Sequence, residues 1–155
     1  MRFFGFDSFE GLPEVDGVDE GDGQFFKGQY ACSREQVEKN LTHNGMDLSR
    51  ATLIEGYYNE SLTEPLREQH PFRQAAVVML DCDLYASTRD ALNWVAPYLR
   101  AGTILVFDDW MSYDGSDDAG QPLAFEQFLD GRSDLAAEHL YDYKHHGRVF
   151  RLQSS

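Results

Sequence analysis

The segment VVMLDCDLYAST, residues 77–88, guides the interpretation of the whole chain, because it runs from apolar residues directly into two carboxylates. Residues 75–80 are apolar at every position rather than at alternate positions, which is typical of a parallel strand covered on both faces. Asp81 and Asp83 then follow at the carboxyl end of this strand. The segment therefore predicts an α/β protein with acidic side chains at one edge of its sheet.

The next strand along the chain repeats this arrangement. Residues 103–107, TILVF, are again solidly apolar and end in Asp108 and Asp109. Between the two strands, residues 88–99 carry apolar side chains at helical spacing, and Gly102 lies just beyond the expected end of the helix. A strand, a helix and a strand in this order predict a right-handed crossover between parallel neighbours.

The flanking sequence extends this alternation of strands and helices. Ser33 and Gln36 form a capping box at the start of a helix that Asn44-Gly45 closes. The other expected elements are strands at 2–6 and 51–56, helices at 61–69 and 123–128, and two short strands around His145-His146-Gly147. This order predicts a single domain over residues 1–155, with a mostly parallel sheet and an antiparallel C-terminal hairpin.

A long loop rich in Gly, Asp and Glu is expected at residues 7–30, where the sequence shows no helical or strand period. Loops of this length in a compact domain are often functional. An EF-hand is the alternative, but with Gly23 at its central position the first and last ligand positions hold Val18 and Gln29. The ligand pattern fails, which disfavours calcium binding in this loop.

Composition places the chain among globular proteins and narrows its partners. Hydrophobic residues make up 42% of the 155 residues, and the net charge of −14 repels phosphate backbones and anionic lipids. Nucleic acid and membranes are therefore not expected partners. No apolar run could span a bilayer and no secretion leader follows Met1, so a cytoplasmic location is expected, with Cys32 and Cys82 as reduced thiols.

The two acidic clusters are the strongest functional signal. Neighbouring parallel strands lie about 4.8 Å apart. Asp81 is therefore expected close to Asp108 and Asp109, where like charges would raise each other's pKa unless a cation lies among them. Carboxylate oxygens suit Mg²⁺, with Mn²⁺ or Ca²⁺ as substitutes. In the alternative interpretation these acids belong to ordinary loops, or Asp83 or Ser87 caps the following helix.

Five blocks of the sequence occur in the order expected of one enzyme family. They are FGFDSFEGLPE, FFKGQY, LIEGYYNESL, LDCDLYASTRDAL and GTILVFDDW. Together they resemble the TylF (macrocin O-methyltransferase) family over about residues 3–129. The resemblance implies a Rossmann-like class I methyltransferase fold, with S-adenosyl-L-methionine and Mg²⁺ as cofactors. It also implies O-methylation of a sugar hydroxyl on a small natural product.

The resemblance further assigns the metal ligands and the base. Asp81, Asp108 and Asp109 would hold Mg²⁺, which would chelate two adjacent substrate hydroxyl oxygens and orient one of them for methylation. Asp81 itself is expected to take the hydroxyl proton, with Asp83 as the alternative. Some relatives carry Lys or His at the position of Leu84, which cannot take a proton.

The cofactor-binding residues implied by the resemblance follow two other strands. Asp7 would bind the cofactor ribose, and Gly56, Tyr57, Tyr58 and Asn59 would surround the adenine. The alternatives are an Asx-turn at Asp7 and ordinary packing for the tyrosines. Trp110, after the metal acids, would line the acceptor pocket or simply cover the sheet edge.

The sequence lacks one feature of this family, a glycine-rich turn after the first strand that supports the cofactor. Nothing of the kind precedes Arg2, and Gly21-Asp22-Gly23 follows no strand and opens no helix. The first strand and first helix are therefore expected to be missing. In the usual strand order 3-2-1-4-5-7-6 the missing strand is central, so two strands should have unpaired edges. The chain is interpreted as a fragment, or as a protein whose partner fills the gap.

Three other functions remain open on the sequence alone. A nucleotide-sugar glycosyltransferase could hold a divalent cation with Asp81-Cys82-Asp83, although Asp108 and Asp109 would then be unexplained. An aspartate-nucleophile phosphatase fits Asp81 and Asp83, but its later acidic pair normally lies farther downstream. A non-catalytic partner module is the third possibility. Homo-oligomerisation of the chain also stays open.

Overall fold

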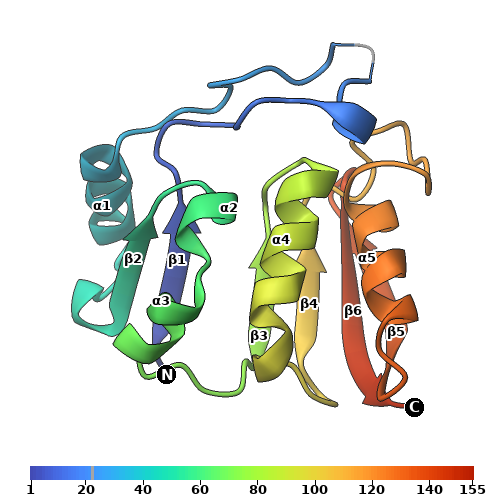
Figure 1. The fold of residues 1–155 in the computed structure, drawn as a ribbon. Coiled ribbons are helices and arrows are strands. Elements are labelled where there is room, and N and C mark those ends of the chain that lie inside the picture. The colour runs from blue at the N-terminus through green and yellow to red at the C-terminus, as the bar shows by residue number, and fades with distance from the viewer. Residues whose placement is uncertain (22) are drawn as a thin grey trace.

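The computed structural model describes residues 1–21 and 23–155. Asp22 of the predicted loop, which lies between Gly21 and Gly23 in the sequence, is outside the described residues. The described strands form a mixed α/β architecture with an antiparallel hairpin at the C-terminus (Figure 1). They are β1 (Phe3–Asp7), β2 (Ala51–Glu55), β3 (Val77–Leu80), β4 (Ile104–Phe107), β5 (Leu135–Tyr143) and β6 (Gly147–Ser154).

The strands of the described residues are divided between two sheets. One sheet is the parallel pair β1-β2, and the other has the order β3-β4-β6-β5. In the second sheet β3 and β4 are parallel, whereas β6 runs antiparallel to both β4 and β5. This is the predicted strand order with its central position left out, and β1 and β3 each pair on one side only within the described residues.

The helices begin and end close to the predicted positions, with two corrections. They are α1 (Arg34–His43), α2 (Tyr58–Ser61), α3 (Glu64–Gln69), α4 (Tyr85–Val95) and α5 (Gly120–Asp130). The helix predicted at 61–69 is present as α3 but starts three residues later, at Glu64, because Ser61 ends the short helix α2 and Pro65 occupies the first turn of α3. The capping box forms only in part, since Ser33 accepts from Gln36 N but the Gln36 side chain donates to Asn40 instead.

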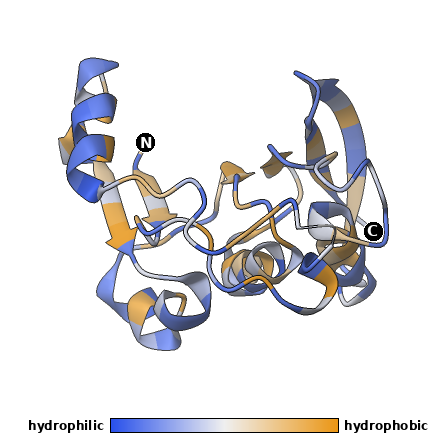
Figure 2. Ribbon diagram, turned by 90° about the horizontal axis from the view of Figure 1, so that it is seen from above, coloured by the Kyte–Doolittle hydropathy of each residue, from blue (hydrophilic) through white to orange (hydrophobic). Residues whose placement is uncertain are grey.

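The prediction that β3 is covered on both faces is wrong. Val77 and Met79 are 59% and 56% exposed, whereas Leu80 is buried, so the strand alternates between an open face and a covered one. Helices α4 and α5 pack on the covered face (Figure 2), where Leu92 and Phe125 meet the sheet in the main hydrophobic core. A continuous apolar run therefore did not distinguish one covered face from two.

An aromatic cluster joins the two sheets where no strand ladder does. We call it the aromatic junction; its members are Phe4, Phe6, Phe72, Trp94 and Tyr98. Trp94, on α4, lies 5.3 Å from Phe6 and 5.1 Å from Phe72, measured between ring centroids. Its indole N–H donates to the carbonyl of Thr63 at 3.1 Å. Since aromatic pairs each contribute about 0.5–1.5 kcal/mol beyond burial, the junction holds β1 and β2 against the rest of the molecule.

The predicted long loop crosses above the carboxyl ends of the strands (Figure 1) and contains one 3-10 turn, Gly17–Asp19. Asp19 is 2% exposed, and its carboxylate accepts hydrogen bonds from Tyr85 N, Ala86 N and the Tyr113 hydroxyl at 2.7, 3.0 and 3.0 Å. Asp19 thus satisfies the free N–H groups that begin α4, which explains why this helix starts three residues before the predicted Thr88. None of the described helices is long and apolar enough to cross a membrane.

Candidate functional site

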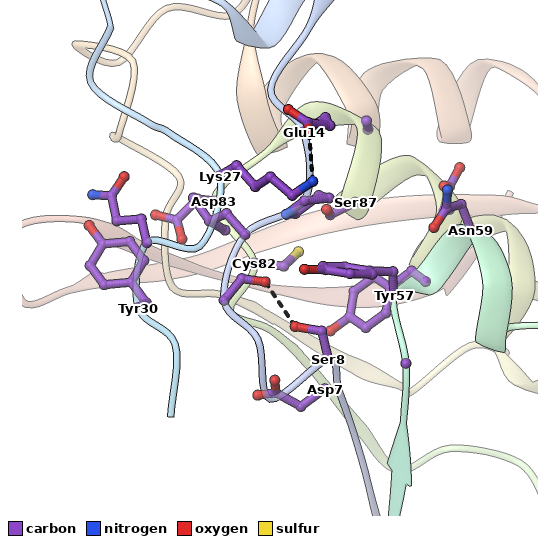
Figure 3. A pocket seen from close by; sticks show the side chains of 18 of the residues that line it. Asp7, Ser8, Glu14, Lys27, Tyr30, Tyr57, Asn59, Cys82, Asp83 and Ser87 are labelled. Carbon is purple, nitrogen blue, oxygen red and sulfur yellow. Dashed lines mark hydrogen bonds and ion pairs between the residues drawn. The ribbon is translucent and has the colours of Figure 1, made fainter. Parts of the chain in front are cut away.

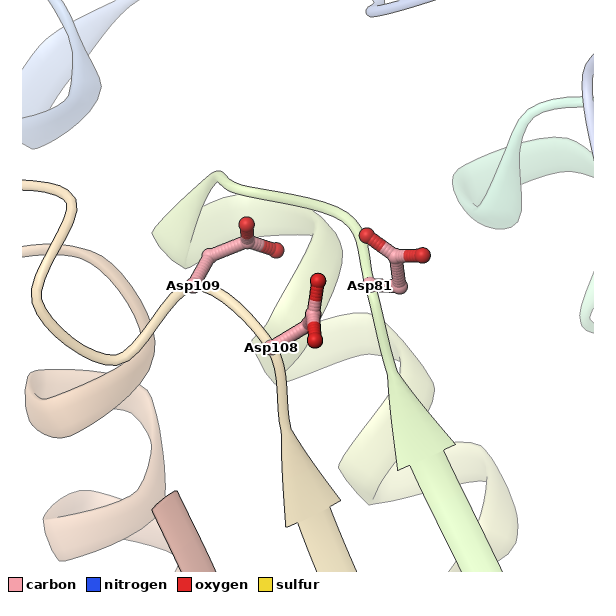
Figure 4. A group of neighbouring side chains, drawn as sticks. All are labelled: Asp81, Asp108 and Asp109. Carbon is pink, nitrogen blue, oxygen red and sulfur yellow. The ribbon is translucent and has the colours of Figure 1, made fainter. Parts of the chain in front are cut away.

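The register of β3 and β4 brings the predicted metal acids together. Leu80 pairs with Phe107, and Asp108 N donates to the carbonyl of Leu80 at 2.9 Å, so Asp81 and Asp108 leave the sheet side by side. One carboxylate oxygen each from Asp81, Asp108 and Asp109 lies within 4.8 Å of the others (Figure 4). Within the described part of the chain this is the one group of residues with the spacing of a metal site.

A buried glutamine fixes the spacing of the two strand ends. Gln121, on the first turn of α5, has no exposed surface. Its side-chain oxygen accepts from Asp109 N at 3.0 Å, and its side-chain nitrogen donates to the carbonyl of Leu80 at 3.1 Å. The amide group therefore ties the end of β3 to the end of β4. Gln121 was not predicted as a site residue, and its only signal in the sequence is a polar side chain just ahead of the helix predicted at 123–128.

The C-terminal hairpin also reaches the acidic cluster. The Tyr143 hydroxyl donates to Asp108 Oδ1 at 2.6 Å, and Lys144 Nζ lies 3.4 Å from the same oxygen. The Tyr143 ring packs over Gly147, where a Cβ atom would lie 2.3 Å from the ring and would displace it. This contact was not predicted, because 35 residues separate Tyr143 from Asp108.

Burial and mutual repulsion perturb the acids of the site. Burial, together with the charges of Asp109 and Asp81, raises the pKa of Asp83 to about 7. Burial also raises the pKa of Asp109 to about 6, against the opposing effect of the hydrogen bond from Asp83 N. The pKa of Asp81 is raised by burial and by Asp108. Such crowding is what a bound cation would relieve.

Neither Asp83 nor Ser87 caps helix α4, so this alternative interpretation is wrong. The residue before α4 is Leu84, whose side chain makes no capping hydrogen bond, and Asp19 from the long loop accepts from the first helical N–H groups instead. Asp83 has φ of 55°, a left-handed conformation that a non-glycine residue seldom adopts. Its side chain lines a cleft, described next, together with Ser87.

A cleft of about 820 Å³ lies between the two sheets and beneath the long loop. It collects the residues predicted to bind cofactor, Asp7, Gly56, Tyr57, Tyr58 and Asn59, and three of the acids, Asp81, Asp83 and Asp109 (Figure 3). Asp108 stands behind them in contact with the hairpin. Residues from three distant parts of the sequence therefore meet in one site.

The individual cofactor candidates differ in their contacts. Asp7 Oδ1 accepts from Phe9 N at 2.7 Å, so the expected Asx-turn is present even though Asp7 also lines the cleft. The Tyr58 hydroxyl donates to the carbonyl of Phe6 at 3.2 Å, and burial raises its pKa, which indicates a packing role. Gly56 has φ of 132°, and a Cβ atom there would lie 3.0 Å from Ser61 Cβ. The strand end after β2 therefore needs glycine.

Two other predicted positions lie inside the protein rather than in the cleft. Leu84 is 1% exposed and packs with Leu12 and Phe25 beneath the loop. Trp110 is 8% exposed, with ring centroids 5.1 Å from Phe107 and 5.0 Å from Phe150. Trp110 covers the sheet edge, which was the second of its two predicted roles.

Comparison with known proteins identifies the family. The family model for macrocin O-methyltransferase (TylF) matches residues 2–129. The chain belongs to this family. The chain is also similar to a protein of Streptomyces olivaceus named 8-demethyl-8-(2,3-dimethoxy-alpha-L-rhamnosyl)-tetracenomycin-C 4'-O-methyltransferase, with 32% identity over 109 residues. The match covers 67% of this chain and 40% of that relative's length.

Solved structures confirm the predicted fold class. The O-methyltransferase NovP superposes with a TM-score of 0.76 at 24% identity, over 99% of this chain and 60% of that chain. CalS11, a calicheamicin methyltransferase, superposes with a TM-score of 0.72 at 27% identity, over 97% of this chain and 60% of that chain. Another structure of CalS11 is titled as a TDP-rhamnose 3'-O-methyltransferase. This member of the TylF family thus has the class I methyltransferase fold, with the central sheet position empty among its described residues.

Proposed function

We propose that the chain carries the metal and acceptor site of an S-adenosylmethionine- and Mg²⁺-dependent O-methyltransferase that acts on a sugar hydroxyl of a natural product. The observation that carries the proposal is the meeting of Asp81, Asp108 and Asp109 within 4.8 Å at the edge of a cleft that also holds Asp7 and residues 56–59. Family membership and the sugar-modifying relative support it. The relatives' names allow two acceptor forms, a finished glycoside or a nucleotide-linked sugar.

The donor set fits a hard divalent cation. Asp81, Asp108 and Asp109 offer only carboxylate oxygens, which Mg²⁺ prefers, and burial together with the neighbouring carboxylates raises the pKa of Asp81 and Asp109. When bound, Mg²⁺ would act as a Lewis acid that lowers the pKa of a substrate hydroxyl. Tyr143 and Gln121 hold Asp108 and Asp109 in place from behind, as supporting residues do in metal sites.

Two observations favour Asp83 over Asp81 as the proton acceptor. Asp81 belongs to the metal cluster, and a carboxylate committed to a cation is a poor base. Asp83 lines the cleft beside Asp109 without belonging to that cluster. A base within reach of the hydroxyl proton is the geometric requirement for this step. Asp83 would therefore receive the sugar hydroxyl proton, and Asp81 would orient the oxygen.

The opposite wall of the cleft fits the cofactor. Asp7, at the end of β1, would accept from the ribose hydroxyls, while Gly56, Tyr57 and Asn59 follow β2 and would contact the adenine. S-adenosylmethionine supplies an activated methyl group when bound. The cleft volume of about 820 Å³ lies within the range of about 300–1,000 Å³ that small-molecule sites occupy.

The test is equilibrium titration of the chain with S-adenosylmethionine and with a nucleotide sugar, each with and without Mg²⁺. The proposal predicts binding of S-adenosylmethionine, followed by Mg²⁺-dependent methylation of a rhamnoside. A glycosyltransferase would bind the nucleotide sugar alone, and a non-catalytic module would bind neither. Either of these results would overturn the proposal.

A further inference from the structure

Asp19 is a buried carboxylate that the proposed reaction does not use. It lies in the loop that covers the cleft, yet it is 2% exposed and does not line the cleft itself. Among the described residues it is the one aspartate or glutamate in the buried interior. Burying a carboxylate costs free energy unless hydrogen bonds compensate for the lost water. The groups that supply these hydrogen bonds therefore show what Asp19 holds together.

Three hydrogen bonds satisfy the Asp19 carboxylate, and they come from two segments beside the acidic cluster. Oδ1 accepts from Tyr85 N at 2.7 Å and from the Tyr113 hydroxyl at 3.0 Å. Oδ2 accepts from Ala86 N at 3.0 Å. Tyr85 begins α4, and Tyr113 lies in the segment between β4 and α5. Asp19 thus ties the long loop to the chain segments that follow β3 and β4.

Asp83, two residues before this contact, has a strained backbone. Its φ is 55°, and Leu84 N donates to the carbonyl of Cys82, so Asp83 is the central residue of a γ-turn. The γ-turn with positive φ is the rare and strained form. A non-glycine residue keeps such a conformation only where the surrounding structure holds it there. The turn at Asp83 therefore needs support from its neighbours.

Contacts on both sides of Asp83 supply this support. Asp83 N donates to Asp109 Oδ2 at 3.1 Å, which anchors the turn to the end of β4. Leu84, the next residue, is 1% exposed and packs beneath the long loop. The following two N–H groups donate to Asp19. Asp19 therefore fixes the C-terminal side of the turn, as Asp109 fixes its N-terminal side.

We infer that Asp19 is a positioning residue, which holds the strained turn so that the Asp83 carboxylate faces the cleft. The inference rests on the proposed function, in which Asp83 takes the proton of the sugar hydroxyl. Without the hydrogen bonds to Asp19 the turn would relax towards negative φ and move the Asp83 side chain. A displacement of about 1 Å can lower the rate of a reaction about 100-fold. Asp19 acts through Asp83 and not on the substrate, because it does not line the cleft.

The variant Asp19→Asn tests this inference, because it keeps the size of the side chain but turns an amide NH₂ group towards donors. Methylation is measured with S-adenosylmethionine, Mg²⁺ and ethyl α-L-rhamnoside as the acceptor probe. The value of kcat should fall about 100-fold, while KM for the rhamnoside and the dissociation constant of Mg²⁺ should each stay within about threefold. Asp19 contacts neither the cleft nor the acidic cluster, so binding should persist.

Amide hydrogen exchange of Asp83, measured by NMR, gives a readout that requires no activity. Asp19 does not bind this amide, whose acceptor is Asp109 Oδ2. If Asp19 holds the turn, the Asp83 amide should nevertheless exchange about tenfold faster in Asp19→Asn than in the wild-type chain. Unchanged exchange would mean that the turn keeps its conformation without Asp19, and this result would overturn the inference.

Thr103→Val is the matched control for a general loss of stability. Thr103 is also a buried polar residue, 1% exposed, and its hydroxyl donates to the carbonyl of Ala75 at 2.8 Å. It precedes β4, whereas the acids follow β4, so the change lies at the opposite end of the sheet. Thr103→Val should lower the melting temperature but leave kcat and the exchange of the Asp83 amide unchanged. An equal fall of kcat in this control and in Asp19→Asn would overturn the inference.

Tyr113→Phe provides a milder variant that decides the question if Asp19→Asn does not fold. It removes one of the three hydrogen bonds to Asp19 and should lower kcat about 3–10-fold. An unchanged kcat in Tyr113→Phe would then overturn the inference.

The outcomes separate this inference from the proposed function. Methyl transfer by the wild-type chain, with kcat of Asp19→Asn within about threefold of it, would overturn the inference and leave the proposed function standing. Absence of methyl transfer by the wild-type chain would overturn the proposed function. The exchange of the Asp83 amide would then decide by itself whether Asp19 holds the turn.

Discussion

The N-terminal half of the molecule, residues 1–74, and the C-terminal half, residues 75–155, hold their site residues in different ways. In the C-terminal half the acids leave adjacent strands of one sheet, and Gln121 and Tyr143 fix their backbone and side chains. In the N-terminal half Asp7 and residues 56–59 follow a sheet of two strands. A two-stranded sheet is marginally stable by itself. The wall proposed to bind cofactor, Asp7 and residues 56–59, therefore depends on the aromatic junction to hold its small sheet in place. The wall proposed to bind metal, Asp81, Asp108 and Asp109, is held by its own four-stranded sheet together with Gln121 of α5. We call these the cofactor wall and the metal wall.

The largest expected effect comes from breaking the aromatic junction. Trp94→Ala removes the side chain that contacts Phe6 and Phe72, and should lower the free energy of unfolding by about 3–5 kcal/mol. Amide hydrogen exchange should show a greater loss of protection in β1 and β2 than in β3 and β4. Trp94→Phe, which keeps an aromatic ring, should retain most of the stability.

An equal loss of protection in β1, β2, β3 and β4 would contradict the idea that the β1-β2 sheet depends on the aromatic junction more than the other sheet does. The Trp94→Ala chain should also keep its affinity for Mg²⁺ while it stays folded, because the acids lie in the other half.

The second prediction concerns the metal wall. Asp108→Asn replaces a carboxylate of the cluster and should weaken Mg²⁺ binding by more than about 100-fold, since even supporting residues of metal sites contribute 10–100-fold. Asp83→Asn, a change of the same kind outside the cluster, should weaken it far less but should abolish methyl transfer. Calorimetry gives both affinities. Equal losses for the two variants would show that the ligand set is wrong.

This contrast between halves also explains what could be predicted from the sequence. Asp81, Asp108 and Asp109 were found because a buried parallel strand ends at a known edge of the sheet and neighbouring strands have a fixed spacing. The strand order and the empty central position came instead from the resemblance to the methyltransferase family. Local patterns were sufficient wherever backbone pairing alone determines where a residue lies.

The supporting residues could not be predicted in this way. Asp19, Gln121 and Tyr143 act through hydrogen bonds to positions 66, 41 and 35 residues away, which no local pattern encodes. The exposed face of β3 was not predicted for a related reason. An apolar run of residues does not reveal whether helices cover one face of the strand or both faces. Long-range packing, rather than strand pairing, determines these features.

The third prediction concerns the support of the metal wall. Gln121→Met keeps the volume of the side chain but leaves Asp109 N without its acceptor, and should weaken Mg²⁺ binding by about 10–100-fold. Gln127→Met is the matched control on the same helix, because Gln127 is exposed and contacts Tyr85 rather than the strands. An affinity unaffected by Gln121→Met would mean that the β3–β4 ladder alone sets the spacing of the acids.

The smallest expected effect is a pH dependence of stability. The acids of the site, whose pKa values are raised, and exposed acids elsewhere, whose pKa values are lowered, should affect stability in different pH ranges. The raised pKa values of Asp83 (about 7) and Asp109 (about 6) mean that the folded state holds protons that the unfolded state has released. Their contribution to stability is therefore complete below about pH 4 and is lost as the pH rises to about 7. Asp134 and Asp142, whose pKa values are lowered by arginine partners, have the opposite effect, but below about pH 4.

Thermal melting of the metal-free chain should thus shift down by a few degrees between about pH 5 and pH 8. Saturating Mg²⁺ should reverse the shift, and Asp83→Asn should reduce it, because the cation or the amide removes the charge that neutral pH would expose. A melting temperature that rises with pH in the metal-free chain would show that these two acids are not crowded as the structure has them.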